Sequence, residues 1–197
     1  MDTFGFIIHP IQIKKDVKRK FPLLGTILPE PVINWACQYF PPQYISEING
    51  LQSQHTGEEV RGWFVAAPYT PPMMMSLPTE KVYDKLVATA KLAHQQGAKI
   101  VGLGAFTSVV GDAGVTIAER LDFPVTTGDS YTVAIAVDAL IEAAQAMDIN
   151  IQQATIAVVG ATGAIGKACS QLLAELCQSL ILVRSEERRV GKECFLL

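Results

Sequence analysis

The sequence predicts an α/β fold built in two parts, and three observations support this prediction. An amphipathic helical pattern at residues 79–97 is followed at once by the apolar run Lys99–Ala105, which is typical of a buried parallel strand. A second apolar run, Ile156–Val159, ends in a glycine-rich turn that opens another helical pattern. A third run, Leu180–Val183, follows that helix. Strand, helix and strand in this order predict a βαβ unit with parallel strands.

Composition limits the function classes that the chain can belong to. The 197 residues are 49% hydrophobic, which is enough to bury a substantial core. The formal net charge is −3, and no Lys/Arg run is interleaved with aromatic residues, so nucleic acid is not predicted as a partner. No apolar stretch reaches the roughly 18 residues that a membrane span needs. The apolar start Phe4–Ile8 is too short for a signal peptide and predicts a first strand.

Cysteine and histidine are scattered along the chain. The four cysteines form no CxxC pair and have no secretory context, so reduced thiols and a cytoplasmic location are expected. The three histidines are far apart in sequence, and no metal site is predicted.

The first 78 residues are irregular, because ten of the chain's eleven prolines lie there. Short strands and short helices are expected in this part. From Thr79, as N-cap, apolar residues recur at helical spacing until Gly97 ends the helix.

Two further elements are predicted between the helical pattern at 79–97 and the glycine-rich turn. Leu121–Val125 is expected to form a short strand. The segment Thr126–Ser130 precedes a long apolar helix from about Tyr131 to Met147, and Asp129 or Ser130 would cap that helix.

The turn after Ile156–Val159 has the spacing of a Rossmann nucleotide-binding turn. Such a turn needs one glycine for the tight bend, one for close approach of the backbone to a diphosphate, and one for helix–strand packing; Gly160, Gly163 and Gly166 fit these roles. The helix N-terminus would bind the diphosphate. A close-packed turn without a ligand is the alternative. The predicted NAD(P)-binding residues are Gly160, Ala161, Thr162, Gly163, Ala164, Ile165 and Gly166.

The helix after this turn is expected to have an apolar face. The residue that follows the next strand would determine whether NAD(H) or NADP(H) binds. The expected apolar face consists of Ile165, Ala168, Cys169, Leu172, Leu173 and Leu176. The residue at this position, which distinguishes NAD(H) from NADP(H), is Arg184. A basic residue there favours NADP(H), although NAD(H) is also possible.

The last residues of the chain do not follow the pattern of a folded domain. Residues 184–194 match one reading frame of a common DNA-sequencing adapter, and a charge cluster there directly follows the apolar run. Arg184 itself has two readings, because a native arginine at this position could be followed directly by the adapter. We therefore expect an N-terminal substrate and catalytic domain at 1–150, the start of a Rossmann domain at 151–183, and a non-native tail at 184–197. A Rossmann half without its remaining strands is expected to bind cofactor weakly.

Three stretches resemble the long-chain acyl-[acyl-carrier-protein] reductases, a group similar to predicted amino-acid dehydrogenases and shikimate-dehydrogenase-like proteins. They are Leu103–Val110, Thr126–Thr132 and Val159–Ala168, with a weaker likeness at Trp35–Gln43. Together they extend the resemblance over most of residues 4–183.

This resemblance implies a two-domain reductase whose N-terminal domain binds the acyl substrate and whose Rossmann domain binds NADPH. The substrate would be a thioester of acyl-carrier protein or coenzyme A, reduced to the fatty aldehyde. The family's nucleophilic cysteine lies beyond Val183, so the catalytic residue is unknown here. Cys37, Cys169 and Cys177 do not occupy its motif and are expected to be structural.

Five polar or aromatic residues are candidates for contacting the substrate or the nicotinamide. They lie in loops and at a helix start suited to hydrogen-bonding a ligand in a cleft between the domains, and they are Thr107, Ser108, Thr127, Asp129 and Tyr131. Ordinary loop closure and helix capping explain the same residues equally well.

Two other functions remain open at the level of the sequence. A shikimate/quinate-type or amino-acid-type dehydrogenase would oxidise an alcohol or an amine without a covalent step. A non-catalytic regulator would bind the dinucleotide and perform no chemistry.

Overall fold

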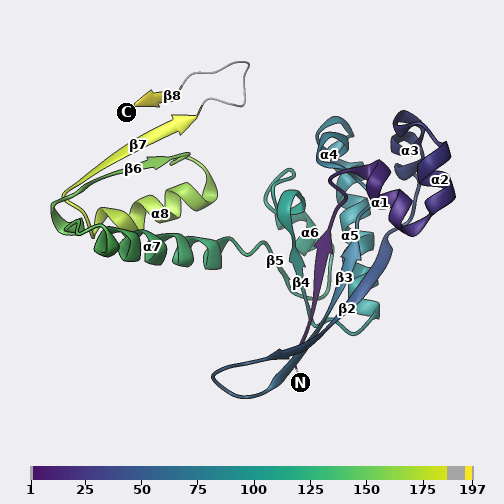
Figure 1. The fold of residues 1–197 in the computed structure, drawn as a ribbon, viewed down its shortest axis with the longest axis horizontal. Helices are drawn as coiled ribbons and strands as arrows, with labels where there is room; N and C mark the ends of the chain where they lie inside the picture. The colour runs from purple at the N-terminus through teal and green to yellow at the C-terminus, as the bar shows by residue number, and fades with distance from the viewer. Residues whose placement is uncertain (1, 186–193, 197) are drawn as a thin grey trace. The chain divides into compact units, whose positions relative to one another are not determined.

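The computed structural model describes residues 2–185 and 194–196, and it confirms the predicted α/β class (Figure 1). The chain forms two compact units, Met1–Thr127 and Gly128–Leu197. The long helix that starts at Asp129 belongs to the second of these units. The domain ranges expected from the sequence, 1–150 and 151–183, stay predictions.

The first unit contains a five-stranded sheet in the order β2-β3-β1-β4-β5. All neighbouring strands are parallel except β2 and β3, which form an antiparallel hairpin. The strands are β1 (Asp2–Ile8), β2 (Gln43–Gln52), β3 (Glu59–Ala66), β4 (Ile100–Leu103) and β5 (Val125–Thr126).

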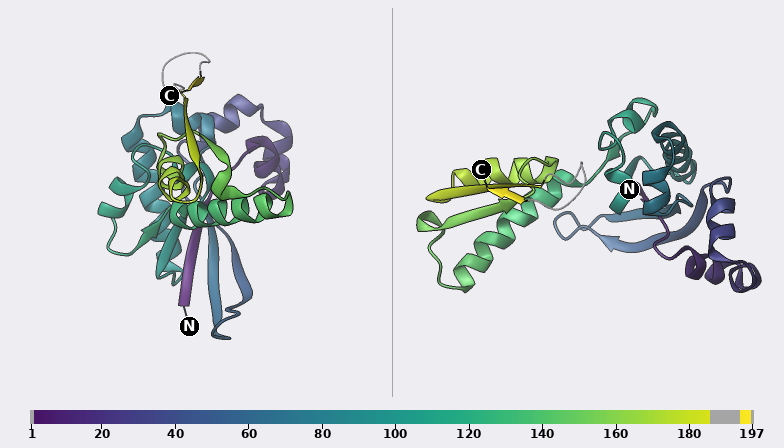
Figure 2. Two further views of the ribbon diagram at one scale, coloured as in Figure 1. Left: turned by 90° about the vertical axis from the view of Figure 1, so that its left-hand side faces the viewer. Right: turned by 90° about the horizontal axis from the view of Figure 1, so that it is seen from above.

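Seven helical segments accompany this sheet. Helices α1–α3 form one group beside it, drawn in purple and violet in Figures 1 and 2, while α5 packs against β1 and β3. The segments are α1 (Ile13–Lys20), α2 (Pro22–Ile27), α3 (Glu30–Cys37), α4 (Pro71–Ser76), α5 (Thr79–Gln95), the 3₁₀ turn η1 (Ala105–Ser108) and α6 (Val115–Glu119).

Helix α5 buries the apolar face that its sequence pattern predicts. Val82, Leu86, Ala90 and Ala93 are fully buried and lie in one core cluster with residues of β1, β3 and β4. Gly97, at φ +109°, confirms the predicted helix end. The predicted N-cap is wrong: Pro78 holds the cap position without a side-chain bond, and Thr79 is already the first helical residue.

The second unit contains the predicted βαβ unit. Strands β6 (Thr155–Val159) and β7 (Ser179–Ser185) pair in parallel, and α8 (Ala164–Ala174) connects them. Helix α7 (Asp129–Ala146) packs on α8, a 3₁₀ turn, η2 (Ile151–Gln153), precedes β6, and β8 (Cys194–Leu196) pairs antiparallel with β7. The predicted tail overlaps β7 and β8, and its residues 186–193 and 197 lie outside the described residues.

Three details of the sequence prediction need correction here. Gly128, with no side-chain cap bond, holds the N-cap of α7, so neither Asp129 nor Ser130 caps that helix. The strand expected at Leu121–Val125 begins only at Val125. On α8, Ile165 and Leu172 are 36% and 48% exposed, so the buried face is narrower than predicted.

Candidate functional site

The glycine turn of the second unit is held against the end of the neighbouring strand. The N–H groups of Gly160 and Ala161 both donate to the carbonyl oxygen of Val183 on β7, at 2.8 and 3.2 Å. Within the turn, the Gly163 N–H donates to the Gly160 carbonyl at 2.9 Å. The path from β6 into α8 is therefore fixed by backbone hydrogen bonds.

Two of the three glycines are required by backbone geometry. Gly160 has φ +80°, a conformation that residues with a Cβ rarely adopt. A Cβ at Gly166 would lie 2.2 Å from the Gly160 oxygen, so only glycine lets α8 pack this closely on the turn. At Gly163 a Cβ would meet only that same oxygen, at 3.4 Å. Packing therefore does not explain the middle glycine.

The start of α8 has the features of an anion-binding helix N-terminus. Its N-cap, Gly163, makes no side-chain cap bond, and its first turn contains no acidic residue. The first N–H groups of a helix have no partner within the helix, and they favour negative charge. Residues 162–165 are exposed, so a diphosphate has access to these groups. Dinucleotide binding by the segment Gly160–Gly166 stays a prediction.

Lys167 lies at the same helix start, and the sequence reasoning did not select it. It is exposed, and its backbone N–H donates to the Gly163 carbonyl at 2.8 Å. A cation in the first turn is unfavourable for an isolated helix because the helix dipole is positive there. A bound phosphate would offset that cost, because it attracts both the lysine and the helix N-terminus. The signal in the sequence was a lysine directly after the third glycine.

In the first unit, the loop that follows β4 uses its hydroxyl groups to close its own turn. Thr107 is fully buried and donates to the Gly104 carbonyl at 2.8 Å, and Ser108 donates to the Ala105 carbonyl at 2.8 Å. Ala105 has φ +49°, an uncommon conformation for alanine. A ligand contact by Thr107 would require this turn to open, and its substrate role stays a prediction.

The other three predicted substrate residues fall on both sides of the unit boundary. Thr127 ends the first unit, and Asp129 and Tyr131 lie in the first turn of α7 in the second. Tyr131 is 73% exposed. Their proposed contact with a substrate also stays a prediction.

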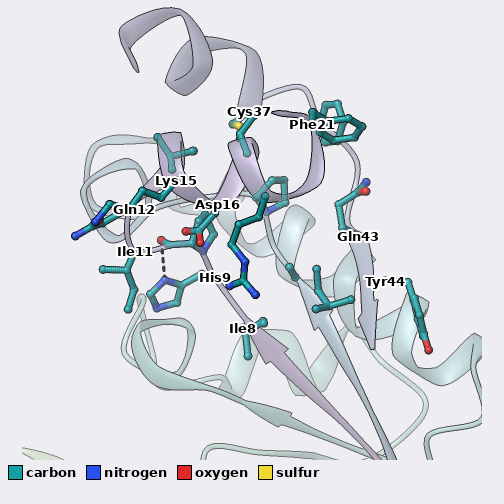
Figure 3. A pocket seen from close by; sticks show the side chains of 18 residues that line it. Ile8, His9, Ile11, Gln12, Lys15, Asp16, Phe21, Cys37, Gln43 and Tyr44 are labelled. Carbon is teal, nitrogen blue, oxygen red and sulfur yellow. Dashed lines mark hydrogen bonds between the residues drawn. The ribbon is translucent and has the colours of Figure 1, made fainter. Parts of the chain in front are cut away.

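A pocket of about 780 Å³ lies in the first unit, and the sequence reasoning did not find it (Figure 3). It is lined by residues from the carboxyl ends of β1 and β3, the start of β2, helix α1, and the end of α3. Ligands of open α/β sheets bind at the carboxyl ends of the strands, so this is an expected place for one. The one sequence signal was the His9-Pro10 break directly after the first strand.

His9 links this pocket to the loop after β4. Its Nε2 accepts the N–H of Phe106 at 3.2 Å, and its Nδ1 lies 3.2 Å from the Pro10 carbonyl oxygen. Because Nε2 accepts, Nδ1 must carry the proton for both contacts to be hydrogen bonds.

Cys37 lines the pocket from the end of α3, but its environment does not activate the thiol. It is 8% exposed and belongs to the core cluster of the first unit. Burial raises the pKa of the Cys37 thiol, and the nearby Lys85 ammonium only partly offsets this. Lys85 itself donates to the Phe40 carbonyl. This supports the structural role expected for Cys37.

We expect Cys37 to react slowly with a thiol-specific alkylating reagent at mildly alkaline pH. Cys177 is only partly buried, so it should be modified about tenfold faster than Cys37. Peptide-resolved mass spectrometry after timed labelling measures both rates, and labelling in denaturant removes the effect of burial. Faster labelling of Cys37 than of Cys177 in the folded chain would show an activated thiol and contradict this expectation.

Among the described residues, no helix is long and apolar enough to span a membrane. No group of three His, Cys, Asp or Glu residues in the described part of the chain is arranged to hold a metal ion.

No protein-family model matches this chain, but curated proteins are similar to parts of it, among them the two that follow. The chain is 31% identical over 140 residues to the long-chain acyl-[acyl-carrier-protein] reductase of Synechococcus elongatus, covering 68% of this chain and 40% of that protein. It is 38% identical over 92 residues to the aminotransferase PigE of a Serratia species, covering 47% of this chain and 11% of that protein. The chain thus spans less than half the length of either relative.

Among solved structures, arylmalonate decarboxylase aligns with 90% of this chain and 59% of its own, at 17% identity and a TM-score of 0.30.

Proposed function

We propose that the chain belongs to an NAD(P)H-dependent oxidoreductase that reduces a long-chain acyl thioester to the fatty aldehyde. The observation that carries this proposal is the glycine turn between the parallel strands β6 and β7, opening directly into α8. The similarity to an acyl-[acyl-carrier-protein] reductase over 68% of the chain supports the choice of reaction.

The second unit would hold the cofactor by its backbone. A Cβ at Gly160 would meet no atom within 4 Å, and the turn beside the α8 N-terminus is exposed, so a diphosphate can approach the main chain closely. Lys167 would add a positive charge to the same side. Arg184, exposed on β7, would favour the additional phosphate of NADP(H) over NAD(H).

The chemistry of the reaction divides between cofactor and protein. The bound nicotinamide would supply a hydride, which with one proton converts a thioester into the aldehyde and the free thiol of the carrier. The first unit would bind the acyl thioester in the pocket at the carboxyl ends of β1 and β3. His9 lines this pocket, and its Nδ1 could donate a hydrogen bond to the substrate only by releasing the Pro10 carbonyl.

We expect the whole protein to oxidise NADPH in the presence of a long-chain acyl thioester and to release the corresponding aldehyde. Loss of NADPH absorbance and chemical trapping of the aldehyde measure the two products. The free fatty acid of the same chain length is the matched control, because it lacks the thioester.

Two outcomes would contradict the proposal. Reduction of NADP⁺ by shikimate, quinate or an amino acid, with no aldehyde from thioesters, would indicate a dehydrogenase of alcohols or amines. Saturable cofactor binding with no turnover of any of these substrates would indicate a regulator.

A further inference from the structure

Helix α1 carries a concentrated positive charge on its outer side. Lys14, Lys15, Lys18 and Arg19 are all exposed. The pairs 14/18 and 15/19 are each four residues apart, so the four side chains lie on adjacent ridges of the helix. On the inner side, Ile13 is 2% exposed and Val17 packs against the core. The helix is therefore apolar inside and basic outside.

No ion pair within the described part of the first unit accounts for the four cations of α1. The described residues contain ion pairs at Arg61, Lys99 and Arg120, but none that involves the four cations of α1. Like charges four residues apart destabilise a helix by their mutual repulsion. The chain as a whole carries a net charge of −3, so this face has the opposite sign to the molecule. An anionic partner would give the charges a function.

The same helix borders the pocket of the first unit. Lys15 and Arg19 line the pocket, together with the half-buried Asp16 (Figure 3). Much of the remaining wall is apolar, and Phe21 and Ile45 are examples. Lys14 and Lys18 do not line it. The pocket wall thus combines apolar side chains with two cations, and two further cations lie outside the pocket on the same helix.

We propose that helix α1 is the docking surface for an acidic carrier protein, whose thioester-bearing arm enters the adjacent pocket. This inference rests on the proposed function, and it selects the protein-bound thioester over free acyl-coenzyme A. Lys15 and Arg19 pair with the phosphate of the arm, and the apolar walls receive its acyl chain. Lys14 and Lys18 contact acidic side chains of the carrier, which a free thioester does not possess.

The test compares two double variants of the chain with opposite charge but the same positions. Lys14→Glu with Lys18→Glu reverses the outer charges, and Lys14→Arg with Lys18→Arg keeps them. Lys91→Glu, on the exposed side of α5, controls for a change in total charge. Binding of a fluorescently labelled acyl-carrier protein is followed by anisotropy at low and at physiological ionic strength, and tryptophan fluorescence checks that each variant is folded.

We expect charge reversal to weaken carrier binding about tenfold or more at low ionic strength, with a smaller difference at higher salt. The arginine variant and Lys91→Glu should bind like the unaltered chain. Binding of acyl-coenzyme A should be the same in all variants, because Lys14 and Lys18 lie outside the pocket.

Three results would overturn this assignment. They are unchanged carrier binding after charge reversal, no carrier binding by the unaltered chain, and charge-dependent binding to anionic lipid vesicles in place of the carrier. Aldehyde formation from acyl-coenzyme A by the whole protein is measured in parallel. If aldehyde forms while charge reversal has no effect, the docking surface is wrong and the proposed reaction stands; if no thioester is reduced, the proposed reaction itself fails.

Discussion

Replacing Gly166 with alanine will destabilise the second unit and abolish the dinucleotide binding that we propose for it. The new Cβ would lie 2.2 Å from the Gly160 oxygen and 2.8 Å from its carbonyl carbon, and both atoms belong to the backbone of the turn. Either α8 moves away from the turn or the turn itself moves. We expect a loss of about 3 kcal/mol, the upper end of the cost of overpacking, because the obstructing atoms cannot rotate away.

Hydrogen exchange measures this effect in the unit concerned. The Gly160 N–H donates to Val183 at 2.8 Å and reports directly on the contact between turn and strand. A loss of about 3 kcal/mol accelerates its exchange about a hundredfold if exchange follows unfolding of the unit. Protection of this amide equal to that in the unaltered chain would show that α8 tolerates a side chain here.

Gly163→Ala is the matched control, because it adds the same methyl group three residues earlier. Gly163 has φ −76°, which alanine adopts freely, and the new Cβ would be at contact distance, 3.4 Å, from the Gly160 oxygen. We expect stability to change by less than about 0.5 kcal/mol. NADPH binding by the whole protein should still weaken, because the methyl group stands where the diphosphate would approach. If binding is unchanged, the diphosphate does not rest on this turn.

The elements that the sequence predicted well are those whose signal is local. Helix α5 has apolar residues at helical spacing along its 17 residues and a glycine shortly after its end. The second unit has a short apolar strand, a glycine turn and a helix in direct succession. In each case neighbouring residues determine the structure. The helix N-caps were predicted less well, because Pro78 and Gly128 occupy positions where a nearby hydroxyl or carboxylate had been expected.

The hairpin of β2 and β3 could not be derived in the same way. Strand β2, Gln43–Gln52, is mostly exposed along its length, so its sequence lacks the alternation of a half-buried strand. Its register also shifts at two places along β3. The conformation of β2 depends on its pairing with β3, and the sequence of neither strand alone predicts that pairing.

The pocket was missed for a similar reason. His9, Asp16 and Cys37 lie within one stretch of sequence but have no motif spacing, and they meet only because α1 and α3 fold back beside the end of β1. The predicted residues Thr107 and Ser108 lie next to Phe106, whose N–H reaches His9. The sequence thus identified a loop beside the pocket, and the structure was needed to identify the pocket itself.

Replacing Leu86 with alanine should have the largest effect on the first unit and none on the second. Leu86 is fully buried between α5 and the sheet, in the same cluster as Ile7, Val65 and Val101. Alanine favours the helix, so the loss comes from the missing side chain and the cavity it leaves, about 3 kcal/mol. Denaturant titration followed by tryptophan fluorescence measures this loss, since both tryptophans of the chain lie in the first unit.

Val87→Ala is the control on the same helix, because Val87 is only partly buried against this core. This substitution should lower the free energy of unfolding by about 1 kcal/mol. The decisive comparison is between the two units. If they fold independently, Leu86→Ala leaves exchange of the Gly160 amide unchanged, and Gly166→Ala leaves the fluorescence transition unchanged. If either substitution destabilises both units equally, the chain unfolds as one cooperative body. The division between Thr127 and Gly128 would then separate two compact units that do not fold independently.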